Sequence, residues 1–385
     1  MRRRRFIASA AGAVALAGTR ASAQLQPGGF ARQYTIGVSV PLTGALATIG
    51  NEIAAGVQAA CDEANRFGPP TQFFAVRRFD DGNEGALAIG NAQLAASDPS
   101  IIGVVGDLSL DVTLQAAPQY ANLSLPLIVP TITADALTKR GYRNIFRLPA
   151  RDEVQGSLMA QMLLRVHAPP RTLVIAPRKG YGSAVARGFI DQAGADHHPT
   201  ASATLENGRL TLDPRTANAF GEGPQLTVLC GTAAELGPVA TAMRAQNYAG
   251  AFACAEGFYS MQTLKDDAKA LGAALVFTTM PPIDRAPSVA QQLGDLRRSV
   301  PEVTAFVAFA YAAAQIFIQG VQRTPTFSRP ALLSLLTYNG SFQTLVGPFT
   351  FSYTGDPTLP NLYAYRIEKG AFHYDRAAFL NGFIL

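Results

Sequence analysis

The sequence has few of the residues, and none of the short motifs, on which most enzyme sites depend. Its 385 residues include three cysteines and four histidines, and the patterns G-x-S-x-G, H-E-x-x-H and C-x-x-C are absent. Residues 180–182 begin like a dinucleotide-binding fingerprint, but Val185 stands where the third glycine belongs. His197 and His198 lie in a polar stretch, where histidines are more often solvated than metal-bound. We therefore predict no enzyme activity, no cofactor and no metal site.

The three cysteines cannot all pair within one chain. Cys230 and Cys254 each follow a short apolar run and could be neighbours in a sheet, whereas Cys61 lies in a helical pattern. The sequence leaves two alternatives open for Cys230 and Cys254: a disulfide between them, or two buried free thiols.

The first 23 residues are typical of a secretory signal. Four arginines precede an apolar run over 6–18, and an Ala-Ser-Ala site ends at Ala23. The run is too short to span a bilayer, and the arginines resemble those of a twin-arginine export signal. We expect cleavage after Ala23 and a periplasmic location.

The chain beyond this leader lacks an excess of charge of either sign. Removing residues 1–23 takes five arginines and no acidic residue, so Lys plus Arg falls from 32 to 27 against 27 Asp plus Glu. The formal charge of +5 therefore belongs to the leader and does not indicate nucleic-acid binding. No other segment has 18 unbroken apolar residues, so we expect a soluble mature protein.

Short apolar runs alternate with helical patterns, which is typical of parallel sheets covered on both faces. We expect strands at 34–40, 73–79, 101–106, 127–129, 172–176, 226–229, 251–253 and 275–278. We expect helices at 47–67, 85–96, 112–120, 153–166, 183–193, 233–245, 261–270, 288–299, 304–318 and 330–336. Breaks at 147–152 and 279–284 favour two sheets over one. The pattern at 345–375 indicates antiparallel strands with turns at 355–356 and 369–370. The polar stretch 200–224 is predicted to form a strand and a long loop.

Three loops of one predicted lobe share small and hydroxyl residues. They are 41–51, 106–113 and 130–135, and each follows a predicted parallel strand. Ligands of such sheets bind beyond the carboxyl ends of the strands, where loops present backbone N–H groups. If the side chains of Asp107 and Asp111 faced the loop at 106–113, they would repel a ligand carboxylate. We therefore expect both residues to cap a helix instead.

Several stretches resemble the leucine/isoleucine/valine-binding protein family, the type I periplasmic solute-binding proteins of ABC importers. They include "YTIGVSVPLTGALATIGNEIAAGVQAACDEAN" at 34–65, "LTKRGYRNIFR" at 137–147 and "GPFTFSYTGD" at 347–356. The resemblance implies an α/β fold of two lobes, each a mostly parallel sheet flanked by helices. Three hinge strands would join them near 148–151, 277–281 and 346–349. Lobe 1 would comprise 30–148 plus 280–346, and lobe 2 would comprise 149–279 plus 347–385.

The resemblance also implies a ligand site between the lobes. The Thr131 carbonyl and Thr133 hydroxyl would hold an ammonium group, with Glu256 as its countercharge. Backbone N–H groups of Thr133 and of the Ser109–Leu110 loop would hold a carboxylate. The remaining residues are Tyr181 and Thr232, closing from the second lobe, and Ile49 and Phe306 around the ligand side chain.

This sequence departs from the family pattern at the site. Leu110 replaces a serine, and Ile49 and Thr232 replace aromatic residues. The family's disulfide positions fall at Asn83 and Ser109, so that bridge is absent. These departures argue against leucine itself. The first expectation is a different α-amino acid, and an amide or an amine-free carboxylic acid is the alternative.

Each of these residues also has a local interpretation. Thr131 and Thr133 suit a turn and a helix cap, Glu256 a solvated loop, and Tyr181 an exposed aromatic packed on the hinge. A ligand-sensing module of the same fold is the other functional class. No transmembrane or signalling segment is predicted in the mature chain, which favours a transport receptor over a sensor. The family resemblance implies a monomer that works with an ABC permease.

Overall fold

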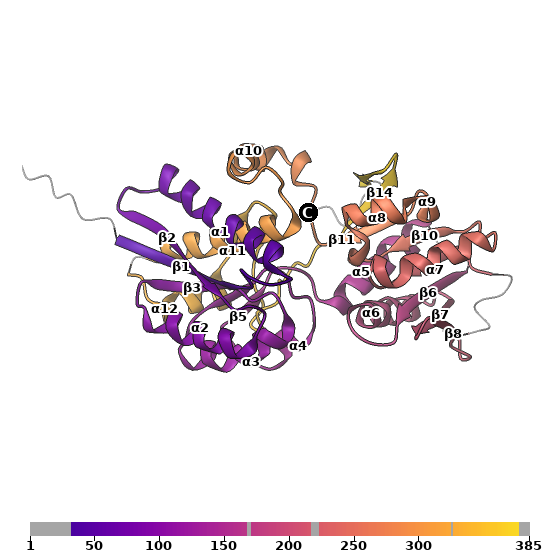
Figure 1. Ribbon diagram of the computed structural model, residues 1–385, viewed down its shortest axis with the longest axis horizontal. Helices are drawn as coiled ribbons and strands as arrows, with labels where there is room; N and C mark the ends of the chain where they lie inside the picture. The colour runs from indigo at the N-terminus through magenta and orange to yellow at the C-terminus, as the bar shows by residue number, and fades with distance from the viewer. Residues whose placement is uncertain (1–31, 168–170, 217–222, 325, 377–385) are drawn as a thin grey trace, which may run out of the picture.

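The computed structural model describes residues 32–167, 171–216, 223–324 and 326–376. The predicted leader, its cleavage site and the last residues assigned to lobe 2 lie outside these ranges. The chain forms two lobes that lie side by side, connected by extended segments (Figure 1). The two-lobed α/β fold predicted from the sequence is confirmed.

The first lobe is built on a five-stranded parallel sheet with the order β2-β1-β3-β4-β5. Its strands are β1 (Arg32–Val40), β2 (Gln72–Asp80), β3 (Ile101–Gly106), β4 (Leu127–Val129) and β5 (Ile145–Arg147). Its helices are α1 (Ala47–Phe67), α2 (Gly85–Ser97), α3 (Leu110–Asn122), α4 (Ala136–Lys139), α10 (Ala290–Ser299), α11 (Ala305–Gln322) and α12 (Arg329–Ser334). A π-helical turn (Leu335–Asn339) and the hairpin of β12 (Phe342–Thr344) and β13 (Gly347–Phe349) complete it.

Alternate strand residues face two different cores. In β4, Leu127 and Val129 pack under α2 and α3, whereas Ile128 packs against the side that α1 and α11 cover. This is the double burial that a continuous apolar strand predicts. By length and composition α11 could cross a membrane, but 72% of its 18-residue apolar window is buried in the protein. It is therefore the core helix of this lobe.

The second lobe is built on an eight-stranded mixed sheet with the order β15-β14-β11-β10-β9-β6-β7-β8. The strands are β6 (Thr172–Pro177), β7 (Thr200–Glu206), β8 (Arg209–Leu212), β9 (Leu226–Leu229), β10 (Ala251–Cys254), β11 (Leu275–Thr278), β14 (Tyr363–Glu368) and β15 (Ala371–Tyr374). The helices are α5 (Asp152–His167), α6 (Tyr181–Ala195), α7 (Ala233–Ala245), α8 (Met261–Asp266) and α9 (Ala268–Leu271). Strands β8, β14 and β15 pair antiparallel, and the others pair parallel.

The three cysteines are buried and free. Cys230 lies in the core under α5 and α6, whereas Cys254 lies in the core on the α7 side of the sheet. Because the two thiols face opposite sides of the same sheet, they cannot bridge without movement of the backbone. Burial raises the pKa of all three thiols, so they stay protonated and unreactive near neutral pH.

The third crossing between the lobes lies later in the chain than 346–349. Strand β13 pairs with β12, and the chain still contacts the first lobe at Phe351, whose ring lies 5.1 Å from that of Phe146. The Gly355 carbonyl accepts the Arg147 N–H at 2.9 Å, and the Asp356 carboxylate pairs with Arg147 at 2.7 Å. The predicted boundary at 346/347 is therefore wrong, because residues 347–357 pack on the first lobe.

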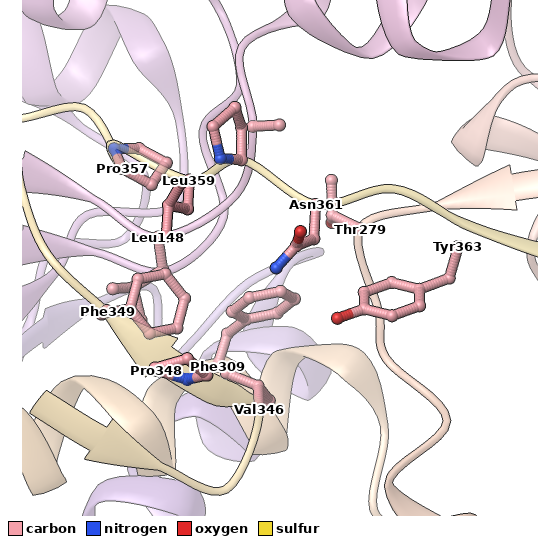
Figure 2. Close-up of a pocket in the computed structure, with 12 residues that line it drawn as sticks. Leu148, Thr279, Phe309, Val346, Pro348, Phe349, Pro357, Leu359, Asn361 and Tyr363 are labelled. Atoms are coloured by element: carbon pink, nitrogen blue, oxygen red, sulfur yellow. The ribbon is translucent and has the colours of Figure 1, made fainter. Parts of the chain in front are cut away.

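The actual crossing runs from about residue 358 into β14. Figure 2 shows this segment passing Thr279 toward Tyr363, with Leu148 and Pro357 on the side of the first lobe. All three crossing segments meet around this small cavity of about 20 Å³, the space of roughly one water molecule.

Of the other predicted turns, helices and strands, some are confirmed by the structure and some are not. The turn at 369–370 is confirmed, with left-handed φ angles of 50° at Lys369 and 74° at Gly370 joining β14 to β15. The single helix expected over 261–270 is two short helices that break at Asp267. The sequence did not predict strands β5, β8 and β12.

Candidate ligand-binding cleft

A cavity of about 300 Å³ lies between the lobes near the hinge. Five of the nine predicted site residues line it: Thr131, Thr133, Tyr181, Glu256 and Phe306. The other lining residues are Pro130, Pro149, Gly257, Tyr259, Thr278, Thr279, Ala305 and Phe309. The cavity thus joins the loop after β4 and the start of α11 in lobe 1 to the loops after β10 and β11 in lobe 2.

Thr131 and Thr133 reach the cavity because β4 ends just before them. The Thr131 hydroxyl donates to the Leu108 carbonyl at 3.4 Å, which ties this loop to the one after β3. The Thr133 carbonyl accepts the Asp152 N–H at 3.1 Å, which ties it to the start of α5. Helix α4 begins at Ala136 without a side-chain cap, so the capping interpretation of Thr133 is not supported.

Glu256 lies in a 3₁₀ turn (Glu256–Phe258) directly after β10. Its Oε1 accepts hydrogen bonds from the Thr278 hydroxyl at 2.8 Å, the Thr279 N–H at 3.0 Å and the Thr279 hydroxyl at 2.7 Å. Within the described residues, Oε2 has no hydrogen-bond partner. Burial raises the pKa of Glu256, and the three hydrogen bonds oppose that rise without cancelling it. The carboxylate is therefore fixed by the hinge and is not a solvated loop side chain.

Tyr181 begins α6 and lines the same cavity as Glu256. Its hydroxyl donates to Gln155 Oε1 at 3.2 Å. Burial, with the nearby charges of Glu256 and Asp152, raises the pKa of Tyr181 well above its ordinary value, so the phenol stays neutral. Asp152 is a second buried carboxyl behind Thr133, and burial raises its pKa to about 6.

Four predicted residues do not line this cavity. Ser109 lies at the start of α3 and hydrogen-bonds Asn83, and Leu110 packs toward the core under α2 and α3. Thr232 forms a capping box with Glu235 at the start of α7, and Ile49 packs against the core beside α1 and α11. This cavity therefore gives no support to their predicted ligand contacts, which stay predictions.

The expectation that Asp107 and Asp111 cap a helix is also not met. Helix α3 has Ser109 at its N-cap position and no side-chain cap. Asp107 is buried near the hydroxyls of Ser39, Thr113 and Tyr120, away from the cavity. Burial raises its pKa to about 7, and the nearby hydroxyls lower it by a smaller amount.

Sequence reasoning missed Tyr259, Thr278, Thr279 and Phe309. Thr278 and Thr279 belong to the hinge stretch that the sequence marks as a break, and Tyr259 belongs to the same loop as Glu256. No lysine, arginine or histidine lines the cavity within the part of the chain that the structure describes, and Glu256 is its single carboxylate. Nor do the described residues contain a group of three or more potential metal ligands. The cavity is therefore suited to a small ligand with an amine or another hydrogen-bond donor.

The sequence profile described as "Periplasmic binding protein" matches residues 33–371. The chain belongs to the periplasmic binding protein family. Members of this family are binding proteins and not enzymes, and the family implies a periplasmic location.

Curated and solved relatives agree with this assignment. The Leu/Ile/Val-binding protein homolog 1 of Brucella abortus is 26% identical over 342 residues, covering 87% of this chain and 91% of that protein. A putative branched-chain amino acid ABC transporter from Rhodospirillum rubrum has the same fold, with a TM-score of 0.78 at 20% identity over 89% of this chain and all of that one. An ABC transporter substrate-binding protein from Desulfitobacterium hafniense, solved with Leu, gives 0.71 at 22% identity over 89% and 99%.

Proposed function

We propose that this protein is the receptor of an ABC importer and binds an amino acid in the cleft between its lobes. The observation that carries this proposal is the fixed carboxylate of Glu256. Its Oε1 is saturated by the hinge threonines, while Oε2 remains to pair with a ligand ammonium group. A buried carboxylate without such a partner is costly, so the site gains most from a cationic group.

Contact between the ligand and Glu256 also couples ligand binding to movement of the lobes. Thr131 and Thr133 belong to lobe 1, whereas Glu256 and Tyr181 belong to lobe 2. A ligand that touches both sets is bound more tightly when the lobes are closed, so it shifts the population toward the closed form. The closed form is the state that a permease would recognise.

The remaining parts of the proposal concern the protein's surroundings. We propose export through the leader with cleavage after Ala23, function as a monomer in the periplasm, and docking on an inner-membrane ABC permease. The family assignment supports this role, as do the relatives whose names refer to amino acids.

A second candidate ligand is an amide or an amine-free carboxylic acid. The raised pKa of Glu256 favours it, because a protonated carboxyl can donate a hydrogen bond to a carbonyl or carboxylate oxygen. A sensing module of the same fold would bind the same classes of ligand.

A thermal-shift screen of residues 24–385 tests the proposal. The panel contains branched-chain and other amino acids, their amides and their deaminated analogues, and hits are measured by calorimetry. We expect an amino acid to bind and Glu256→Gln to weaken it at least tenfold. Glu206→Gln, an exposed glutamate paired with Arg178, is the matched control. Binding of deaminated analogues alone, unaffected by Glu256→Gln, would contradict the amine site.

A further inference from the structure

A second cavity, of about 370 Å³, adjoins the ligand cavity. The two share Tyr259 and Ala305 in their walls, so they are neighbouring chambers of one cleft. Residues of both lobes line the second chamber. The hinge segment after β11, α10 and the start of α11 form one wall, and β14 and β15 form the other. The Tyr365 hydroxyl donates to the Met280 carbonyl at 3.3 Å, which fixes the chamber at the hinge.

An aromatic wall forms one side of the second chamber. The Tyr259 ring centroid lies 4.9 Å from that of Tyr365 and 4.6 Å from that of Phe372. Tyr259 and Phe372 are half-buried, so parts of their rings remain available to a ligand. Such a wall suits a flat apolar group, because aromatic pairs gain energy beyond the burial of their area.

The charges of the two chambers differ in sign. The ligand chamber has Glu256 and no cation among its described lining residues. The second chamber has Arg285, Arg297 and Asp284, of which Arg297 and Asp284 pair with each other. Arg285 has no carboxylate partner in the described part of the chain. Helix α11 also begins at this chamber. Its N-cap residue, Thr304, lines the chamber, and the Thr304 hydroxyl donates to the Glu52 carboxylate at 2.6 Å.

We propose that the natural ligand is elongated and fills both chambers. Its amine lies at Glu256, an aromatic or similarly flat body lies against Tyr259 and Phe372, and its carboxylate lies near Arg285. This inference rests on the proposed function only in placing the ligand's amine at Glu256. It explains why the loop predicted to hold an α-carboxylate, Ser109–Leu110, lies outside the ligand chamber: the anionic end is held elsewhere.

Calorimetry with truncated probes tests this inference. The long probes are 4-(aminomethyl)benzoate and glycyl-phenylalanine, and the short ones are leucine, benzylamine and 4-methylbenzoate. We expect at least one long probe to bind tenfold or more tightly than every short probe. Arg285→Gln should weaken that probe about tenfold and leave leucine and benzylamine unchanged. Arg298→Gln, an exposed arginine outside both chambers, is the matched control and should change nothing.

Other outcomes separate the two proposals. Leucine binding as tightly as both long probes, or a long probe indifferent to Arg285→Gln and to Phe372→Leu, would overturn the second chamber. If Arg285→Gln weakens 4-methylbenzoate while Glu256→Gln affects no probe, the amine site fails and the anionic chamber stands. Failure of all five probes to bind the wild-type protein would contradict the two-chamber ligand, whereas the amino-acid site is judged by the wider screen of amino acids.

Discussion

At the scale of single residues, buried carboxyls are the distinctive feature of this protein. Glu256, Asp152, Asp107 and Asp81 all have raised pKa values, and in each case burial is the main cause. They divide into two groups by position. Glu256 lines the ligand cavity and the Asp152 N–H donates to the Thr133 carbonyl beside it, whereas Asp81 and Asp107 directly follow β2 and β3. The first group should control binding, and the second should control stability.

Ligand affinity should depend on pH through Glu256. An ammonium group needs the ionised carboxylate, and the raised pKa means that Glu256 takes up its proton at a higher pH than an ordinary glutamate. Affinity for an amine ligand should therefore fall as the pH decreases toward the ordinary glutamate pKa of 4.5, and the fall should begin at a higher pH than for an ordinary glutamate. Calorimetry across this range checks it, with Glu256→Gln as the control whose affinity is low and flat. An affinity that does not change with pH in the wild-type protein would refute this role.

The buried Asp107 should make the protein less stable as the pH rises. Its pKa is raised from 3.8 to about 7, so between these values the folded chain holds a proton that the unfolded chain has lost. Asp107→Asn removes this penalty and should raise the free energy of unfolding near pH 8 by on the order of 2 kcal/mol. Urea unfolding at pH 5 and pH 8 measures the effect. The gain should be smaller at pH 5, and equal changes at both pH values would argue against it.

At the scale of elements, the close packing of α1 on α11 holds the first lobe together. Gly56 of α1 sits where a Cβ atom would come within 2.5 Å of the Val307 carbonyl oxygen in α11. Gly90 of α2 has open space around it and an ordinary helical backbone. The two glycines therefore offer a matched pair of substitutions.

Gly56→Ala should destabilise the protein by about 2 kcal/mol, because the two helices must move apart. Gly90→Ala should stabilise it by about 0.5–1 kcal/mol, because alanine loses less backbone entropy in a helix. Chemical denaturation of both variants measures the difference. Equal effects would show that α1 and α11 are not packed as described.

The elements that the sequence predicted well are those with local signals. Strands β3 and β4 are continuous apolar runs between helical patterns, and the predicted positions of β1 to β4 agree closely with the structure. Strand β5 escaped prediction because it ends at Arg147, whose buried guanidinium is paired by Asp356, 209 positions away. That same long-range pair holds 347–357 on the first lobe, which explains why the predicted boundary was too early.

The candidate site shows the same limit. Thr131, Thr133 and Glu256 follow strand ends, so both the local pattern and the family resemblance point to them. Thr278 and Thr279 become site residues only because the hinge strand brings them beside Glu256. Ser109 and Thr232 match the family by position. In the structure, however, the Ser109 side chain hydrogen-bonds Asn83, and the Thr232 side chain hydrogen-bonds Glu235. The Thr-x-x-Glu spacing at 232–235 is a capping-box signal that the sequence does show. Asn83 lies 26 positions from Ser109, so that contact could not be foreseen from local sequence.

At the scale of the whole molecule, the account makes one central claim: a ligand is captured between two lobes that close on it. Every part of the cleft lies beside the hinge, and its walls come from both lobes. The ligand's contacts with Glu256 on one side and with Thr131 and Thr133 on the other would supply the energy of closure.

Small-angle X-ray scattering of residues 24–385, with and without a saturating ligand from the screen, tests this claim most directly. We predict that the radius of gyration of the wild-type protein decreases when the ligand binds. At a ligand concentration near the wild-type Kd, Glu256→Gln should show a clearly smaller decrease than wild type, while Glu206→Gln should behave as wild type. A wild-type protein that binds its ligand by calorimetry and keeps an unchanged radius of gyration would contradict capture by lobe closure.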